Sequence, residues 1–184
     1  MLNLTDLFVV QNRLFLIMNV LVVPSLVNIL IAYAMANILF QSGADVFFWG
    51  ENGMLIDMLI SSFMASLITS LIAFYSTLSS CNRGLLSLRK EKNGFKLFDK
   101  LSPRPVLACI YCAILALLLS GLILGLFVSF YDENHISWSA FLISKSTQAM
   151  LISIYSSLAG TLLAIRFAHN KPYRERYTPQ ESLK

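Results

Sequence analysis

Four long stretches of the chain are almost entirely apolar, and shorter polar segments separate them. Only three charged residues, Asp57, Lys145 and Arg166, fall within these stretches. A helix needs about 20 residues, at a rise of 1.5 Å each, to cross a hydrocarbon core about 30 Å thick, and every stretch is longer than this. The pattern therefore predicts an all-α, polytopic membrane protein with four transmembrane helices, over residues 14–40, 54–80, 106–131 and 138–167.

The composition agrees with this interpretation. Apolar residues make up 57% and charged residues 13% of the 184 residues, whereas a soluble domain is about 25% charged. Four spans leave no room for a separate soluble domain, so we expect a single integral membrane domain over residues 1–184. The lipid bilayer is then its main partner, and the first apolar stretch is too long for the core of a cleavable signal peptide.

Lysine and arginine residues lie on one side of the predicted bilayer. Loops 41–53 and 132–137 carry acidic residues but no Lys or Arg, whereas the middle loop 81–105 carries seven and the tail 168–184 carries four. The positive-inside rule places both termini, the basic loop and the tail in the cytoplasm. The basic loop also contains Leu and Phe, which indicates a segment lying on the anionic inner leaflet rather than one that binds nucleic acid.

Asp57 and Lys145 are the candidate site residues. A charge at the centre of a spanning helix costs about 2.5–3.5 kcal/mol, so such residues usually pair or line an interior. Asp57 lies about 5 Å and Lys145 about 10 Å inside the outward ends of their spans. The two form either an intramembrane ion pair or a site for a substrate or a proton. Alternatively, Asp57 is a solvated carboxylate in the first turn of its helix, and Lys145 extends to the outer headgroups.

The second and fourth spans are weakly similar when they are aligned at an offset of 87 residues. Ser66 and Ser70 then match Ser153 and Ser157, and Asp57 falls one position from Lys145. Because both spans run inward, this similarity predicts two helical hairpins that are parallel repeats about an axis along the membrane normal. The common demands of helix packing are an alternative explanation.

Small residues recur at intervals of four along three of the spans. This spacing places them on one helix face, where backbones approach closely and hydroxyl groups bond between helices. We expect these ridges to hold the bundle together, with a polar pathway lined by hydroxyl groups as the alternative. The ridges are Ser61-Ala65-Thr69-Ala73-Thr77 and Ser62-Ser66-Ser70; Ala108-Cys112-Ala116-Ser120 and Gly121-Gly125-Ser129; and Ala149-Ser153-Ser157-Thr161 and Ser156-Gly160-Ala164.

The first span and the loop after it contain residues that are unusual for a simple anchor. Pro24 lacks an N–H group and is expected to kink the helix. Asn19 and Asn28 indicate either hydrogen bonds to other helices or a bend that exposes carbonyl groups to a substrate. The aromatic run Phe47-Phe48-Trp49 is typical of side chains at the headgroup level.

The cysteines raise two further possibilities. Cys109 and Cys112 form a C-x-x-C motif, which indicates a redox pair in other settings. Here both enter the third span from the predicted cytoplasmic side, where thiols are kept reduced, and the outward loops contain no cysteine. A metal site would need these two residues together with Cys81 and His169, and no spacing brings the four together. We therefore expect neither a metal nor another cofactor.

No catalytic motif is present, so enzyme activity is not expected. The segments MLIDMLISSFMASLI (54–68) and WSAFLISK (138–145) resemble small uncharacterised four-helix bacterial inner-membrane proteins over about residues 10–168. The resemblance implies a location in the cell inner membrane and no particular activity. The leading expectation is a non-enzymatic accessory or interaction subunit, alone in a homo-oligomer or with a larger membrane protein. The alternatives are a small permease-like transporter with a site around Asp57 and Lys145, and an immunity-type protein against a pore-forming toxin.

Overall fold

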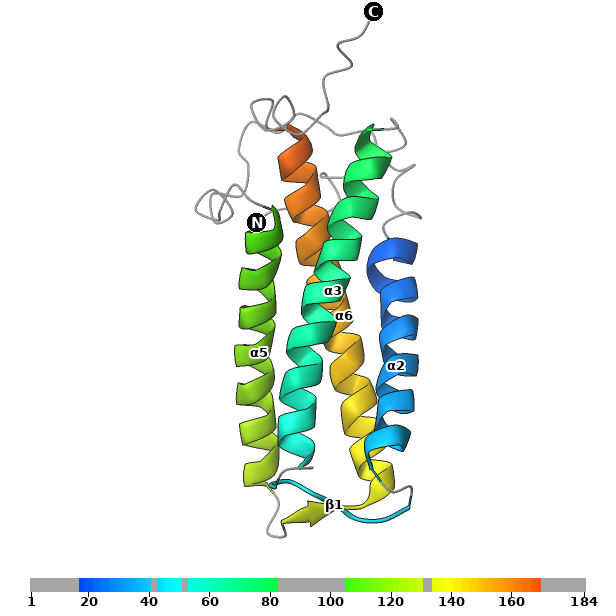
Figure 1. Cartoon of the computed structure of the whole chain (residues 1–184), viewed down its shortest axis with the longest axis vertical. Helices are drawn as coiled ribbons and strands as arrows, with labels where there is room; N and C mark the ends of the chain where they lie inside the picture. The colour runs from blue at the N-terminus through cyan, green and yellow to red at the C-terminus, as the bar shows by residue number, and fades with distance from the viewer. Residues whose placement is uncertain (1–16, 41–42, 51–52, 83–104, 131–133, 170–184) are drawn as a thin grey trace, which may run out of the picture.

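The computed structural model describes residues 17–40, 43–50, 53–82, 105–130 and 134–169, and each predicted span is helical (Figure 1). All four helical segments are long and apolar enough to cross a membrane. The all-α prediction is thus confirmed, while most of the basic loop and of the tail lies outside the described residues. In chain order the elements are the π-helix η2 (Ile17–Val22), α2 (Val23–Leu39), β1 (Val46–Phe47), α3 (Met54–Asn82), α5 (Pro105–Ser129), β2 (His135–Ile136) and α6 (Trp138–His169).

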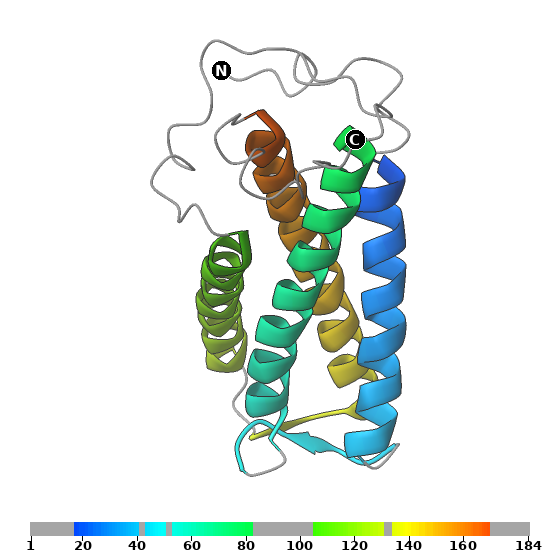
Figure 2. The ribbon, with the colours of Figure 1, turned by 45° about the horizontal axis from the view of Figure 1, so that its top comes forward.

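A central pair of helices, α3 and α6, organises the bundle. The two run in the same direction away from the end that holds β1 and β2, whereas α2 and α5 run in the opposite direction (Figures 1 and 2). The contacts of α2 are mainly with α6, and those of α5 are mainly with α3. The first helix of each hairpin therefore packs mainly against the second helix of the other hairpin.

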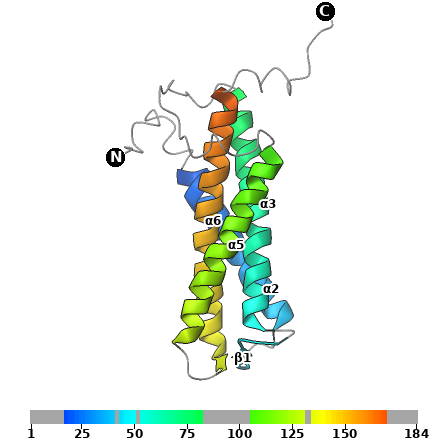
Figure 3. The same cartoon turned by 90° about the vertical axis from the view of Figure 1, so that its left-hand side faces the viewer.

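The loops of the two hairpins meet at one end of the elongated bundle (Figure 3). Strands β1 and β2 pair in antiparallel fashion, with Val46 opposite Ile136 and Phe47 opposite His135. The aromatic side chains of residues 47–49 lie in two different environments. Trp49 is 64% exposed, whereas Phe48 is only 1% exposed. Phe48 does not face the lipid, because its ring is buried in an apolar cluster with Met54, Met58 and Phe141. This cluster closes the β1–β2 end of the bundle.

Small residues allow α3 and α6 to approach closely, as their spacing predicts. Ser62, Ser66 and Ser70 on α3 and Ser153 and Ser156 on α6 are all buried. A β-carbon on Gly160 would lie 2.3 Å from the carbonyl oxygen of Ser70, so only glycine fits at this position.

One predicted ridge does not pack in this way. Among the described residues, no atom beyond its own stretch of helix lies within 4 Å of a β-carbon built on Gly125, and Ser129 is exposed. The other ridge of α5, which includes Ala108, Cys112 and Ala116, is buried instead. Consecutive residues of a helix point about 100° apart, so one narrow face of α5 cannot turn both ridges toward α3.

The predicted kink at Pro24 takes the form of a change in helix type. Pro24 lies in the first turn of α2, directly after the π-helix η2. A proline ring clashes with the carbonyl group four residues earlier in a regular α-helix. In a membrane-spanning helix, a local π-helical turn is one way to accommodate this clash. The carbonyl oxygen of Asn19, in η2, accepts a hydrogen bond of 3.1 Å from Ser157 Oγ on α6. The irregular turn is therefore joined to α6.

Candidate functional site

Asp57 and Lys145 lie together in the structure. Asp57 is in the first turn of α3, while Lys145 is one turn further along α6, about 10 Å from the start of that helix. Helical side chains tilt toward the N-terminus, so the long Lys145 side chain extends back toward the level of Asp57. Lys145 Nζ donates a hydrogen bond to Asp57 Oδ2. The Lys145 side chain is 3% exposed and that of Asp57 is 11% exposed.

Aromatic rings cover the ammonium group of this ion pair. Lys145 Nζ lies 5.8 Å from the ring centroid of Phe40 and 5.6 Å from that of Phe141. The two rings lie 4.7 Å apart, and Trp138 packs against Phe141 at 5.6 Å. The faces of aromatic rings attract cations, and the attraction is stronger where water is absent. Lys145 therefore points into the bundle rather than toward the headgroups.

The carboxylate has a second partner on its own helix. Ser61 Oγ donates to Asp57 Oδ1 over 3.4 Å, one turn along α3. Asp57 also lies near the positive end of the α3 dipole, which favours a negative charge. Bringing two charges out of water costs several kcal/mol for each ion, and their attraction repays this cost only with good geometry and additional hydrogen bonds. The Asp57–Lys145 pair has a direct hydrogen bond between its charged groups and an additional one from Ser61 to the carboxylate.

A seam of polar side chains continues from the ion pair along the contact between α3 and α6. Gln148 Nε2, on the turn after Lys145, donates to Ser62 Oγ over 2.7 Å. Ser156 Oγ donates to Ser66 Oγ, also over 2.7 Å. Further along, Thr77 Oγ1 donates to Thr161 Oγ1 over 3.4 Å. These bonds tie α3 to α6 along much of their length.

Asn28 connects α2 to the same seam. Its Nδ2 atom donates to Thr69 Oγ1 on α3 over 2.9 Å and to Ser153 Oγ on α6 over 2.6 Å. Asn28 therefore forms hydrogen bonds to other helices, which is the first of the two roles that its position in the first span suggested. Gln148 was not among the residues singled out from the sequence, although its position three residues after Lys145 places it on the same face of α6.

The C-x-x-C motif lies away from the ion pair, near the other end of the bundle. Cys109 and Cys112 are buried free thiols packed beside Phe74 and Leu163. Tyr155 donates to the backbone carbonyl oxygen of Cys112 over 3.5 Å. Within the part of the chain that the structure describes, no three His, Cys, Asp or Glu side chains are close enough to hold a metal ion. The side chain of His169, proposed as a fourth ligand, lies outside that part.

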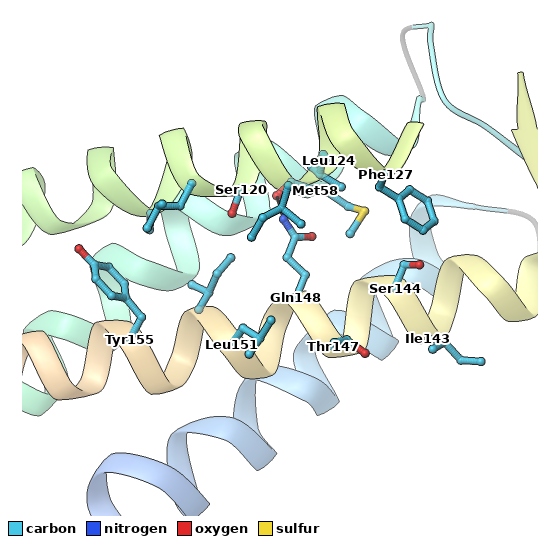
Figure 4. A pocket seen from close by; sticks show the side chains of 14 residues that line it. Met58, Ser120, Leu124, Phe127, Ile143, Ser144, Thr147, Gln148, Leu151 and Tyr155 are labelled. Carbon is cyan, nitrogen blue, oxygen red and sulfur yellow. Dashed lines mark hydrogen bonds between the residues drawn. The ribbon is translucent and has the colours of Figure 1, made fainter. Parts of the chain in front are cut away.

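Two grooves border the seam, one on each side. The α2-side groove, about 300 Å³, includes Lys145, Ser61 and Met64 in its wall. The α5-side groove, about 410 Å³, lies mainly between α5 and α6 (Figure 4). Gln148 and Ile152 line both grooves, so these two side chains form part of the wall between them.

The chain was also compared with known proteins. No protein-family model, curated protein or solved structure matches it.

Proposed function

We propose that the protein is a non-enzymatic accessory or interaction subunit of the cell inner membrane. The observation that carries this proposal is that the polar groups of the interior bind one another. Among the described residues, Ser25 Oγ is the only fully buried side-chain oxygen or nitrogen without a hydrogen-bond partner. The bonds that join helices include those of Asp57, Lys145 and Asn28, and such interhelical bonds are typical of a stable structural bundle.

The proposed orientation has both termini in the cytoplasm. Its support is the distribution of charge, because the two loops at the β1–β2 end carry no Lys or Arg while the basic loop and the tail carry eleven. The positive-inside rule relates such an asymmetry to the cytoplasmic side. The ion pair would then lie near the outer face of the membrane. Helical rather than barrel spans favour the inner membrane.

We also propose that the two hairpins are repeats, and the contacts between them support this. Four side-chain hydrogen bonds between α3 and α6 join residues that are 84, 86, 88 and 90 positions apart. These separations lie close to the offset of 87 that aligns the two sequences. A two-fold axis between the hairpins would bring equivalent residues of parallel helices together in this way. It would also pair the two equivalent loops in antiparallel fashion, as β1 and β2 are paired.

Photocrosslinking in native membranes tests the accessory role. A photoreactive amino acid would replace one strongly exposed residue on each helix: Leu30 (68% exposed), Ile72 (64%), Leu122 (63%) or Met150 (42%). A subunit with a defined partner gives a discrete product from one face of the bundle and none from the opposite face. A homo-oligomer gives a product of twice 20.6 kDa.

Other results of this experiment would contradict the accessory role. A product that forms only when cells meet a pore-forming toxin would support the immunity role instead. If all four positions react only with lipid, the protein has no stable partner on any of these faces, and the accessory role is refuted.

A small transporter is the second candidate, and one observation favours it. The grooves on both sides of the bundle meet at Gln148, one turn from the buried ion pair. A movement that breaks the bond from Gln148 to Ser62 would open the seam beside the ion pair, where a proton or a substrate could then reach Asp57 and Lys145. Proton flux into proteoliposomes under an imposed membrane potential tests a proton-coupled version of this function. A transporter shows flux that Asp57→Asn abolishes, whereas an accessory subunit shows none.

A further inference from the structure

The α5-side groove is open to the side of the bundle. Leu119, Ile123 and Leu151 line it and are 46%, 54% and 52% exposed. All three belong to helices that are candidates for spanning the membrane. In a bilayer this opening therefore faces hydrocarbon, and a ligand must enter from the lipid phase.

Several hydroxyl groups in this groove form no hydrogen bond within the described residues. Ser120 on α5 is 4% exposed, and its hydroxyl group forms no hydrogen bond with any described residue. Figure 4 shows the Ser120 and Gln148 side chains extending toward one another from α5 and α6. Gln148 uses its Nε2 atom to bind Ser62 and Met58, which leaves its Oε1 atom free to accept a hydrogen bond. Neither atom is fully enclosed by the bundle, so a ligand in the groove can form a hydrogen bond with each of them.

The α2-side groove provides an internal comparison. Its main polar side chains, those of Asn28, Ser61, Ser62 and Lys145, all form hydrogen bonds within the bundle. Gln148 Oε1, which the two grooves share, is the remaining acceptor there, and no hydroxyl group among these side chains is left without a hydrogen bond. On the α5 side, by contrast, the hydroxyl groups of Ser120, Ser144 and Thr147 all lack hydrogen bonds within the described chain.

Charge and depth restrict what the α5-side groove can bind. None of the described residues that line it is charged. Gln148 lies about 15 Å from the start of α6, near the middle of a hydrocarbon core about 30 Å thick. A phosphate or carboxylate group is strongly disfavoured at that depth, and phospholipid headgroups remain at the interface. The ligand must therefore be neutral.

We propose that the α5-side groove binds a neutral, lipid-soluble alcohol. Its hydroxyl group accepts a hydrogen bond from Ser120 Oγ and donates one to Gln148 Oε1, while its apolar chain lies against Leu119, Ile123 and Leu151. A hydroxyl group matches this site because it both donates and accepts. A volume of about 410 Å³ lies within the range of small-molecule pockets. The site is separate from the ion pair and does not depend on the accessory role.

The test is the thermal unfolding of the purified full chain in detergent with three probes. The probes are 1-dodecanol, dodecane as the same chain without a hydroxyl group, and dioleoylglycerol as a two-chain alcohol. Binding to the folded state raises the unfolding midpoint in a saturable way. We expect this rise with 1-dodecanol and little or none with dodecane. The response to dioleoylglycerol tells whether the natural alcohol is a two-chain glycerol lipid or a single-chain molecule.

Variants locate the site. Ser120→Ala removes one hydrogen bond and should weaken the apparent affinity for 1-dodecanol about two- to tenfold. Leu151→Trp should fill the groove and abolish the midpoint rise. Met64→Trp is the matched control, because Met64 is 48% exposed and lines the α2-side groove. It should leave the rise unchanged.

Two outcomes would overturn the proposal. An equal midpoint rise with dodecane and 1-dodecanol would mean that the groove holds hydrocarbon only. Loss of the rise in Met64→Trp, with the rise retained in Leu151→Trp, would place binding on the α2 side. If Leu151→Trp does not fold, Ser120→Ala alone decides, because unchanged affinity in this variant refutes the hydroxyl contact.

Discussion

Gly160 of α6 lies directly against the backbone of Ser70 on α3. A β-carbon on Gly160 would stand 2.3 Å from the Ser70 carbonyl oxygen and 3.1 Å from the Ala73 β-carbon. The first of these neighbours is backbone, which cannot rotate away. The distance between the two central helices therefore depends on the absence of a side chain at position 160.

Gly160→Ala should destabilise the bundle for this reason. Separating α3 from α6 by even part of an ångström weakens the serine and threonine bonds between them, and overpacking of a core costs about 1–3 kcal/mol. The measurement is the free energy of unfolding in a mild detergent titrated with a denaturing one. Gly125→Ala is the control, because no described atom outside its own stretch of helix lies within 4 Å of the added carbon. In that variant helix propensity alone should stabilise α5 by up to about 1 kcal/mol. Equal effects at the two positions would contradict the close contact.

Asp57 and Lys145 should be energetically coupled. Removal of one partner from a buried pair leaves the other charge without compensation, at a cost of about 3–5 kcal/mol when burial is complete. Asp57→Asn and Lys145→Met should each destabilise the protein, and the double variant should recover part of the loss. A double-mutant cycle measured by thermal unfolding in detergent checks this. The effects of independent substitutions on the unfolding free energy add within about 0.3–0.5 kcal/mol. Simple additivity would therefore show that Asp57 and Lys145 do not interact in the detergent-solubilised protein.

Replacement of both cysteines of the C-x-x-C motif should be tolerated. Cys109 and Cys112 pack as small apolar side chains among Phe74 and Leu163, so Cys→Ala at both positions removes little volume. We expect a loss of about 1 kcal/mol per site and normal amounts of protein in the membrane. The measurements are the unfolding free energy and any cellular phenotype of the double variant. Loss of the phenotype with normal folding would instead indicate a redox role.

The orientation can be tested with reporter fusions. Fusions after Lys90 and after Lys184 should report the cytoplasm, and a fusion after Glu51 should report the outer side, because Lys and Arg are concentrated in the basic loop and the tail. A cytoplasmic signal at Glu51 would contradict the proposed topology. Moving positive charge into the β1–β2 loops, with Asp45→Lys and Glu51→Lys together, should weaken the outside signal if charge sets the orientation.

Sequence alone was sufficient to locate the four spans and to select Asp57 and Lys145. Hydropathy is a local property, since a bilayer requires about 20 apolar residues whatever lies beside them. A charged residue within such an apolar segment is costly and rare, so it can also be recognised from the local sequence. The observed helices begin and end within a few residues of the predicted spans, over the part of the chain that is described.

Only the tertiary structure decided how the helices face one another. The direction of Lys145, the burial of Phe48 and the choice between the two ridges of α5 depend on the rotation of each helix about its axis. Nearly every face of these helices is apolar, so hydrophobic periodicity does not determine that rotation. It is set by close contacts such as Gly160 against Ser70 and by hydrogen bonds such as Gln148 to Ser62. These contacts join residues about 90 positions apart in the chain, which is why local sequence patterns do not reveal them.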